Sequence, residues 1–113
     1  MSFSFSKQDR IRKGREYTGL KMSGKVSKTK LLVFNFNPSE RSRLGVIVTK
    51  KVGNSVVRNR VKRWIKEVFR LERQTLARPL DVVIIPRRSD MSFGGIKKDF
   101  QFFAGKQNEI SPD

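Results

Sequence analysis

The sequence contains no cysteine and no histidine. These absences exclude a disulfide scaffold, a zinc finger, and any nucleophile built on cysteine or assisted by histidine. No apolar run approaches the roughly 20 residues that a membrane-spanning helix needs, so no membrane partner is expected. The stretch from Met1 to Ser6 has neither a basic start nor an apolar run, which predicts no signal peptide. A cytoplasmic protein is therefore expected.

Acidic residues are also scarce. Ten Asp and Glu stand against 26 Lys and Arg, which gives the 113-residue chain a formal net charge of +16. Hydrophobic residues still make up 36% of the chain and include nine Phe, enough for a folded core. The length predicts a single domain over residues 1–113. The charge favours a polyanionic partner.

The positive charge is gathered in two blocks. Residues 1–30 and residues 50–73 each carry nine Lys or Arg and two acids, which is a net +7 for each block. Cations packed this densely repel one another, so their expected use is to displace counterions from nucleic acid. A solubilising surface is the alternative, although the solubility of a small domain needs a net charge of only about 2–8.

The hydrophobic pattern predicts an α+β fold, an α/β sandwich whose helices pack on a small mixed sheet of about four strands. An extended arm is expected over 1–9 and a frayed tail over 106–113. Between them we expect a short helix, two strands paired antiparallel, a long helix, a third strand, and a last helix capped by Gly105. The third strand follows a helix, so it should pair in parallel with an earlier strand. The six expected ranges are 13–23, 31–36, 44–49, 56–73, 81–86 and 92–104. Along 31–36, Leu32, Phe34 and Phe36 alternate and should share one face of the strand.

The helix predicted over residues 56–73 is amphipathic, and Asn54 offers it an N-cap. We expect the apolar stripe to pack on the sheet, with Trp64 in the core; base stacking by Trp64 is the alternative. Asn59 lies on the polar side, where it can contact a base edge or a phosphate, or simply be solvated. The apolar stripe comprises Val57, Val61, Trp64, Ile65, Val68 and Leu71. The opposite, basic side comprises Arg58, Arg60, Lys62, Arg63, Lys66, Arg70 and Arg73, diluted only by Glu67 and Glu72.

No catalytic residue and no metal ligand is expected in this chain. Protein-based hydrolysis of a phosphodiester usually needs clustered carboxylates that hold metal ions, or a histidine base. The ten acids form no close pair in the sequence. Asp81, Asp90 and Asp99 recur every nine residues but fall on a strand, a loop and a helix, so we interpret them as caps and surface charges. The chemistry is expected to belong to a partner.

Residues 50–63 read Lys-Lys-Val-Gly-Asn-Ser-Val-Val-Arg-Asn-Arg-Val-Lys-Arg. This long, ordered run resembles the signature of the bacterial ribonuclease P protein component, with the Arg-Asn-Arg triplet at 58–60 as its core. Phe5 followed by Arg10-Ile11 resembles the family's N-terminal segment. Residues 44–48 and 81–87 resemble its flanking strands. The resemblance covers about residues 5–104.

The resemblance implies a βαβ crossover around the basic helix. It also implies a subunit of ribonuclease P, the endoribonuclease that removes the 5′ leader from precursor tRNA. The implied partners are the ribonuclease P RNA and precursor tRNA, with no DNA and no required protein oligomer. The implied cofactor is Mg²⁺, held mainly by the RNA subunit and the substrate, and catalysis is expected from that RNA.

The resemblance also assigns residues to two RNA sites. Lys21 stands where the family often has Phe, and Asn35 where an aromatic is common, so the leader cleft should rely on charge and hydrogen bonds. For Tyr17, a core position is the alternative to the cleft. The residues expected to bind the catalytic RNA are Lys50, Lys51, Gly53, Asn54, Arg58, Asn59, Arg60, Lys62, Arg63, Lys66 and Arg70. Those expected to bind the leader are Arg12, Lys13, Tyr17, Lys21, Val33 and Asn35.

A structural rRNA-binding protein of the ribosomal type would have the same composition, and it remains the alternative function. The ordered signature favours ribonuclease P. A helical module for double-stranded DNA is disfavoured by the apolar strands and by the lack of a compact three-helix pattern.

Overall fold

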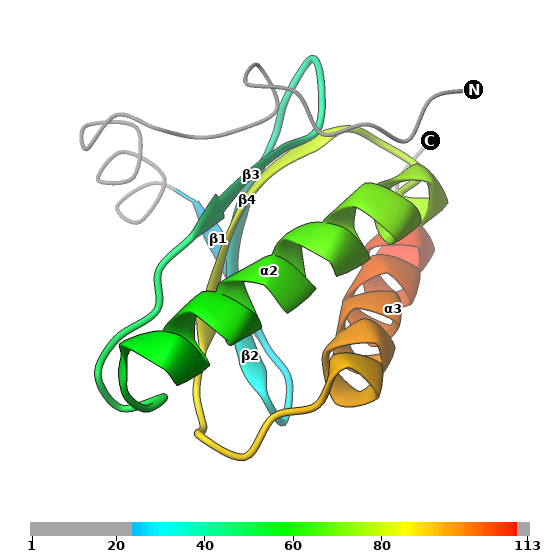
Figure 1. Ribbon diagram of the computed structural model, residues 1–113. Helices are drawn as coiled ribbons and strands as arrows, with labels where there is room; N and C mark the ends of the chain where they lie inside the picture. The colour runs from blue at the N-terminus through cyan, green and yellow to red at the C-terminus, as the bar shows by residue number, and fades with distance from the viewer. Residues whose placement is uncertain (1–23, 111–113) are drawn as a thin grey trace.

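Two long helices cover one face of a four-stranded mixed sheet in the computed structural model (Figure 1). The structure describes residues 24–110, without the side chains of the last two. The expected arm over 1–9 and the expected helix over 13–23 lie outside the described residues. The predicted fold class is confirmed. The elements are β1 (Lys25–Lys28), β2 (Leu32–Pro38), β3 (Arg43–Val46), α2 (Ser55–Glu72), the 3-10 turn η2 (Arg73–Thr75), β4 (Leu80–Pro86) and α3 (Phe93–Ile110).

The strand order is β1-β2-β4-β3. Strand β4 is parallel to β3 and antiparallel to β2, so the expected parallel partner and the βαβ crossover through α2 are confirmed. The expected antiparallel pairing of the first two strands is wrong, because β4 lies between β2 and β3. The reason is burial: Val82 and Ile84 are covered on the helix side and Val83 on the other side. A strand that is apolar on both faces gains most from a central position.

The sequence pattern missed β1 and overextended β3. Strand β1 carries Lys25 and Lys28, and Val26 is 56% exposed. Lysines on an exposed edge strand protect it from pairing with another chain, and they also remove the apolar alternation by which a strand is recognised. Strand β3 ends at Val46, although the backbone N–H of Ile47 still donates to Ile84 of β4 at 3.1 Å.

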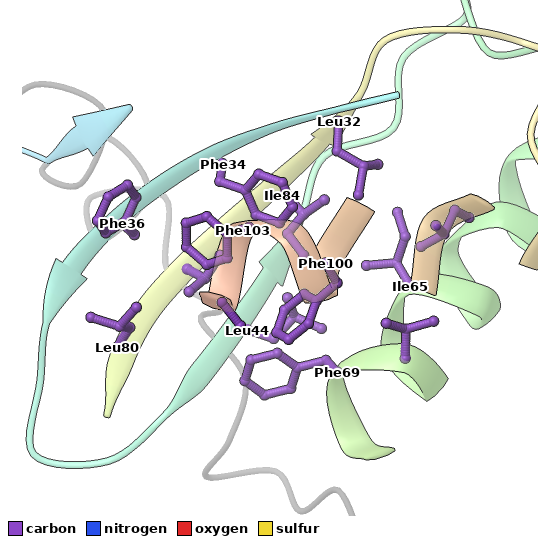
Figure 2. Packing of buried hydrophobic residues seen from close by; sticks show 14 of the residues in the cluster. Leu32, Phe34, Phe36, Leu44, Ile65, Phe69, Leu80, Ile84, Phe100 and Phe103 are labelled. Carbon is purple, nitrogen blue, oxygen red and sulfur yellow. The ribbon is translucent and has the colours of Figure 1, made fainter. Parts of the chain in front are cut away.

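The core between the sheet and the helices is rich in phenylalanine (Figure 2). Phe34 of β2 stacks on Phe103 of α3 with ring centroids 4.1 Å apart, and Phe100 meets Phe69 of α2 edge-on at 6.1 Å. The alternation that placed Leu32, Phe34 and Phe36 on one face of β2 is confirmed by their burial. Phe69 was not among the expected stripe residues, yet it is fully buried.

Helix α3 continues to Ile110, so the expected end at Ala104 with Gly105 as its cap is wrong. Among the described glycines, only Gly53 has a positive φ, so Gly105 follows the ordinary helical path. The Asn108 side chain accepts from the Ala77 N–H and donates to the Thr75 carbonyl, both at 2.8 Å. These bonds fasten the last turns of α3 to the segment after α2, which outweighs the preference of glycine for a helix end.

Candidate nucleic-acid interface

A tight turn sets the start of α2. The backbone N–H groups of Val52 and Gly53 donate to Thr49 and Lys50, at 3.1 and 3.2 Å. Val52 is buried and anchors the turn, which leaves Lys50 and its neighbour at 51 exposed. Gly53 has φ 148°, and a Cβ added there would lie 3.0 Å from the side chain of Val57. Glycine is therefore required at this position by both its backbone angle and the close approach of α2.

Asn54 is the N-cap of α2, as expected. Its side-chain oxygen accepts a hydrogen bond from the Val57 N–H at 3.0 Å, and its carbonyl accepts from Arg58 at 2.9 Å. The first satisfies one of the free N–H groups that begin any helix. The cap and the turn together direct the first turn of α2 along the sheet.

The buried face of α2 decides which side chains face outward. Val61, Ile65 and Val68 are each 1% exposed and pack into the core. Trp64 is half-buried against that core, which agrees with the expected core position. The Arg60 guanidinium lies 5.3 Å from the centroid of the Trp64 ring. A cation over an indole face is held in place while it stays accessible, so Arg60 is partly preorganised for an outside partner.

A shallow depression of about 520 Å³ runs along the outward side of α2. Five residues line the depression, and four of them are among those expected to bind RNA. The remaining lining residue, Val56, is 71% exposed and was not predicted from the sequence. The one-turn spacing between members, three or four residues, could have identified Val56 as their neighbour. The lining residues are Val56, Asn59, Lys62, Arg63 and Lys66.

Two of the expected cations are not fully available to solvent. Arg70 donates to Glu67 on the same helix, with Nε 3.1 Å from Oε1. This hydrogen bond lowers the pKa of the Glu67 carboxyl, because the guanidinium favours its charged form. The Nε of Arg58 is buried and has no hydrogen-bond partner. One nitrogen of the Arg58 guanidinium is thus buried, and the charge of Arg70 is partly neutralised.

The expected leader-binding residues are only partly described. Val33 and Asn35 lie on β2 on the sheet face away from α2 and α3, since their neighbours Leu32, Phe34 and Phe36 face the helices. Val33 is half-buried and Asn35 is 6% exposed. Arg12, Lys13, Tyr17 and Lys21 lie outside the described residues.

Among the described side chains, no three acidic residues come together as a group that could hold a metal ion. Asp81 instead forms a two-pronged ion pair with Arg43, at 2.9 and 2.7 Å, and Asp99 accepts the Leu31 N–H at 2.8 Å. These carboxylates stabilise the sheet and the turn before β2.

Comparison with known proteins decides the family. The family model described as Ribonuclease P matches residues 5–107. The ribonuclease P protein component of Desulfatibacillum aliphaticivorans is 41% identical over 90 residues, covering 78% of this chain and 76% of that protein. The component from Syntrophus aciditrophicus is 38% identical over 108 residues, covering 92% and 91%. The chain belongs to the bacterial ribonuclease P protein family.

The solved structure of the Staphylococcus aureus RNase P protein agrees. It superimposes with a TM-score of 0.77 at 26% identity, covering 90% of this chain and 96% of that one. The protein is therefore a subunit of the ribonuclease P ribonucleoprotein, and it assists removal of the 5′ leader from precursor tRNA. Membership implies association with ribonuclease P RNA and precursor tRNA in a generally magnesium-dependent family. No described helix is long and apolar enough to cross a membrane.

Proposed function

We propose that the outward side of α2 binds the ribonuclease P RNA. The observation that carries the proposal is the depression along α2, where Lys62, Arg63 and Lys66 converge with Asn59. Side chains one helical turn apart form a short row of positive charge, which can follow the phosphates of an RNA strand. The amide of Asn59 can add a hydrogen bond to a base edge or to a sugar.

The described cations of this interface should not contribute equally. Arg60 and Arg63 are exposed, so each can neutralise a phosphate and release a counterion. Arg70 is paired with Glu67, so it must give up part of that ion pair before it binds RNA, and the Nε of Arg58 is buried. Lys50 and Lys51 extend the positive surface along the turn before α2.

The leader is proposed to bind on the other side of the sheet. Val33 and Asn35 point away from the helices, so the sheet separates them from the basic side of α2. Arg12, Lys13, Tyr17 and Lys21 are proposed to complete that site. The protein then links the catalytic RNA on one side to the substrate leader on the other. This arrangement favours precursor over product, because only precursor reaches both surfaces.

The reaction itself is proposed to occur on the RNA. Mg²⁺ is proposed to be held mainly by the RNA subunit and the substrate, because the described acids form no cluster for it. The protein lowers the magnesium requirement by neutralising phosphates that would otherwise repel one another. We place this role in the cytoplasm, with no protein oligomer required.

The test is single-turnover cleavage of a precursor tRNA by the cognate RNA at low magnesium, with and without the protein. We expect the protein to restore cleavage at the mature 5′ end. The double variant Arg60→Ala/Arg63→Ala should need a higher protein concentration for the same rescue. Rescue by the double variant at the wild-type concentration would contradict the assignment of α2.

The leader site is tested separately with Tyr17→Ala. This variant should weaken binding of precursor tRNA to the holoenzyme and leave binding of mature tRNA unchanged. An equal loss for both ligands would show that the substitution damages the fold or the holoenzyme, and it would remove Tyr17 from the leader site.

A further inference from the structure

Helix α3 carries a large aromatic side chain on its outward side. Phe102 is 63% exposed, whereas Phe100 and Phe103 beside it are fully buried. Full exposure of a phenylalanine ring to water is unfavourable, and within the described residues no larger aromatic surface is left open. The position is therefore a candidate contact for a partner.

Lysines and a surface hollow lie next to Phe102. The Nζ of Lys106, one turn later, lies 6.0 Å from the centroid of the ring, and Lys98, one turn earlier, is exposed. A hollow of about 260 Å³ is lined by Gln101, Phe102, Gly105 and Lys106. An aromatic face between two lysines can stack on a base while the lysines meet the adjoining phosphates.

Gly105 has no packing role inside the described chain. A Cβ added at this position would meet nothing within 4 Å, and the backbone there is helical. Glycine inside a helix costs about 1 kcal/mol relative to alanine. The fold thus carries a penalty at a position that lines the hollow beside the Phe102 ring.

We propose that Phe102 and the hollow beside it hold an unpaired nucleotide of the ribonuclease P RNA. The inference rests on the proposed binding of that RNA through α2. Gln101 connects the two surfaces, because its Nε2 donates to Glu72 at the end of α2 at 3.0 Å. One RNA can therefore follow the basic side of α2 and place a flanking nucleotide on α3.

The positive charge around Phe102 favours RNA, rather than a second copy of the protein, as the occupant of this surface. Self-association through this face would bring Lys98 and Lys106 of one copy against the same lysines of the other, on chains of net charge +16. A polyanion gains from the same lysines. The ring would then stack on a base, and the lysines would neutralise the adjoining phosphates, as in other sites for single-stranded RNA.

The test measures binding of the full-length protein to the cognate ribonuclease P RNA, by titration at several salt concentrations. Phe102→Ala should weaken binding about tenfold, which is the size of one lost base–aromatic stack, and leave the salt slope unchanged. Phe102→Trp should bind as tightly as the wild type, and Phe102→Leu should lose nearly as much as alanine. If leucine bound as tightly as phenylalanine, the stacking proposal would be overturned.

A pair of glycine variants separates binding from stability. Gly105→Ala should raise Tm by about 4 °C through helix propensity and yet weaken RNA binding, because the new methyl group narrows the hollow. Gly94→Ala is the matched control, since Gly94 lies on the same helix and also has open space around it. It should leave RNA binding unchanged.

The outcomes distinguish this inference from the proposed function. Tight wild-type binding that is unchanged in Phe102→Ala and Gly105→Ala would overturn the α3 site alone. Failure of the wild type to bind the cognate RNA would overturn the proposed function and the α3 site together. A wild-type dimer in sedimentation that Phe102→Ala converts to monomer would assign this face to a second copy and overturn the RNA assignment.

Discussion

Helices α2 and α3 are both 18 residues long and pack on the same face of the same sheet, but their outward sides differ. The outward side of α2 is a row of cations around a shallow depression. The outward side of α3 has an exposed aromatic ring with a lysine above it. Both helices satisfy the core with apolar side chains, so the fold leaves their outward sides free to differ.

The two helices therefore differ in the kind of interaction that their outward side chains can form with RNA. Exposed cations such as those on α2 bind phosphates with an affinity that depends on salt and hardly on sequence. A ring on α3 can supply a contact that is insensitive to salt and selects unpaired nucleotides.

The largest effect is expected from the buried side of α3. Phe100→Ala should destabilise the protein by about 3–5 kcal/mol, because it leaves a cavity against Phe34, Phe69 and Phe103. Denaturant unfolding measures this. The neighbouring variant Phe102→Ala should change the unfolding free energy by no more than about 0.5 kcal/mol. Similar losses in the two variants would mean that the outward side of α3 is structural.

The second largest effect on stability is expected from the turn before α2. Gly53→Ala should cost about 1–3 kcal/mol, because alanine is strained at a φ of 148° and its methyl group meets Val57. RNA affinity should fall with it, since the turn directs the start of α2. Thermal unfolding and RNA titration of the same variant check both effects. A variant of wild-type stability would show that this turn tolerates an L side chain.

The N-cap of α2 should have a smaller effect. Asn54→Ala removes the hydrogen bond to the Val57 N–H and should cost about 1 kcal/mol, while Asn54→Asp should retain most of the stability. Because Asn54 carries no charge, alanine should leave the salt slope of RNA binding unchanged. A shallower slope would place the Asn54 region in direct contact with phosphates.

The smallest effect concerns the ion pair on α2. Arg70 lowers the pKa of Glu67 below its ordinary value of 4.5, so the charged carboxylate stabilises the folded state above that pH. This stabilisation is lost as the pH falls through the lowered pKa. Between pH 6 and pH 3, the wild type should therefore lose slightly more stability than Glu67→Gln, as followed by denaturant unfolding. Identical pH profiles would show that the pair is not formed in solution.

Glu67→Gln also bears on the function of α2. The substitution releases Arg70 from its partner and removes a negative charge from the basic side, so RNA binding should tighten slightly. Weaker binding would mean that the ion pair holds Arg70 in the geometry that RNA needs.

Local features of the fold were predictable from the sequence. Alternation identified β2 through Leu32, Phe34 and Phe36, and the Asn54 cap marked the start of α2. The central position of β4 was not predictable from local spacing, because it depends on pairing between strands far apart in the chain. The end of α3 was not predictable for a similar reason. The helix continues past Gly105, and Asn108 is held by hydrogen bonds to Ala77 and Thr75, which are distant in the sequence.

The candidate site follows the same division. Helical periodicity placed Asn59, Lys62, Arg63 and Lys66 on one side of α2, and the structure brings them together in one depression. Periodicity did not reveal that Arg58 is partly buried or that Phe69 belongs to the core. Both lie at the edge of the apolar stripe, and Phe69 is buried there because Phe100 of α3 packs against it. The spacing of Glu67 and Arg70, by contrast, already suits an ion pair on a helix.

The most direct test of the account is the salt dependence of binding to the cognate ribonuclease P RNA. For the wild type, the logarithm of the affinity should fall linearly with the logarithm of the salt concentration. The double variant Arg60→Ala/Arg63→Ala should make that slope shallower by about 1.4–1.8, because two phosphate contacts are lost. The matched variant Lys25→Ala/Arg88→Ala removes two exposed cations outside α2 and should leave the slope nearly unchanged. An equal change in both variants, or none in the first, would contradict the claim that α2 attaches the protein to its RNA.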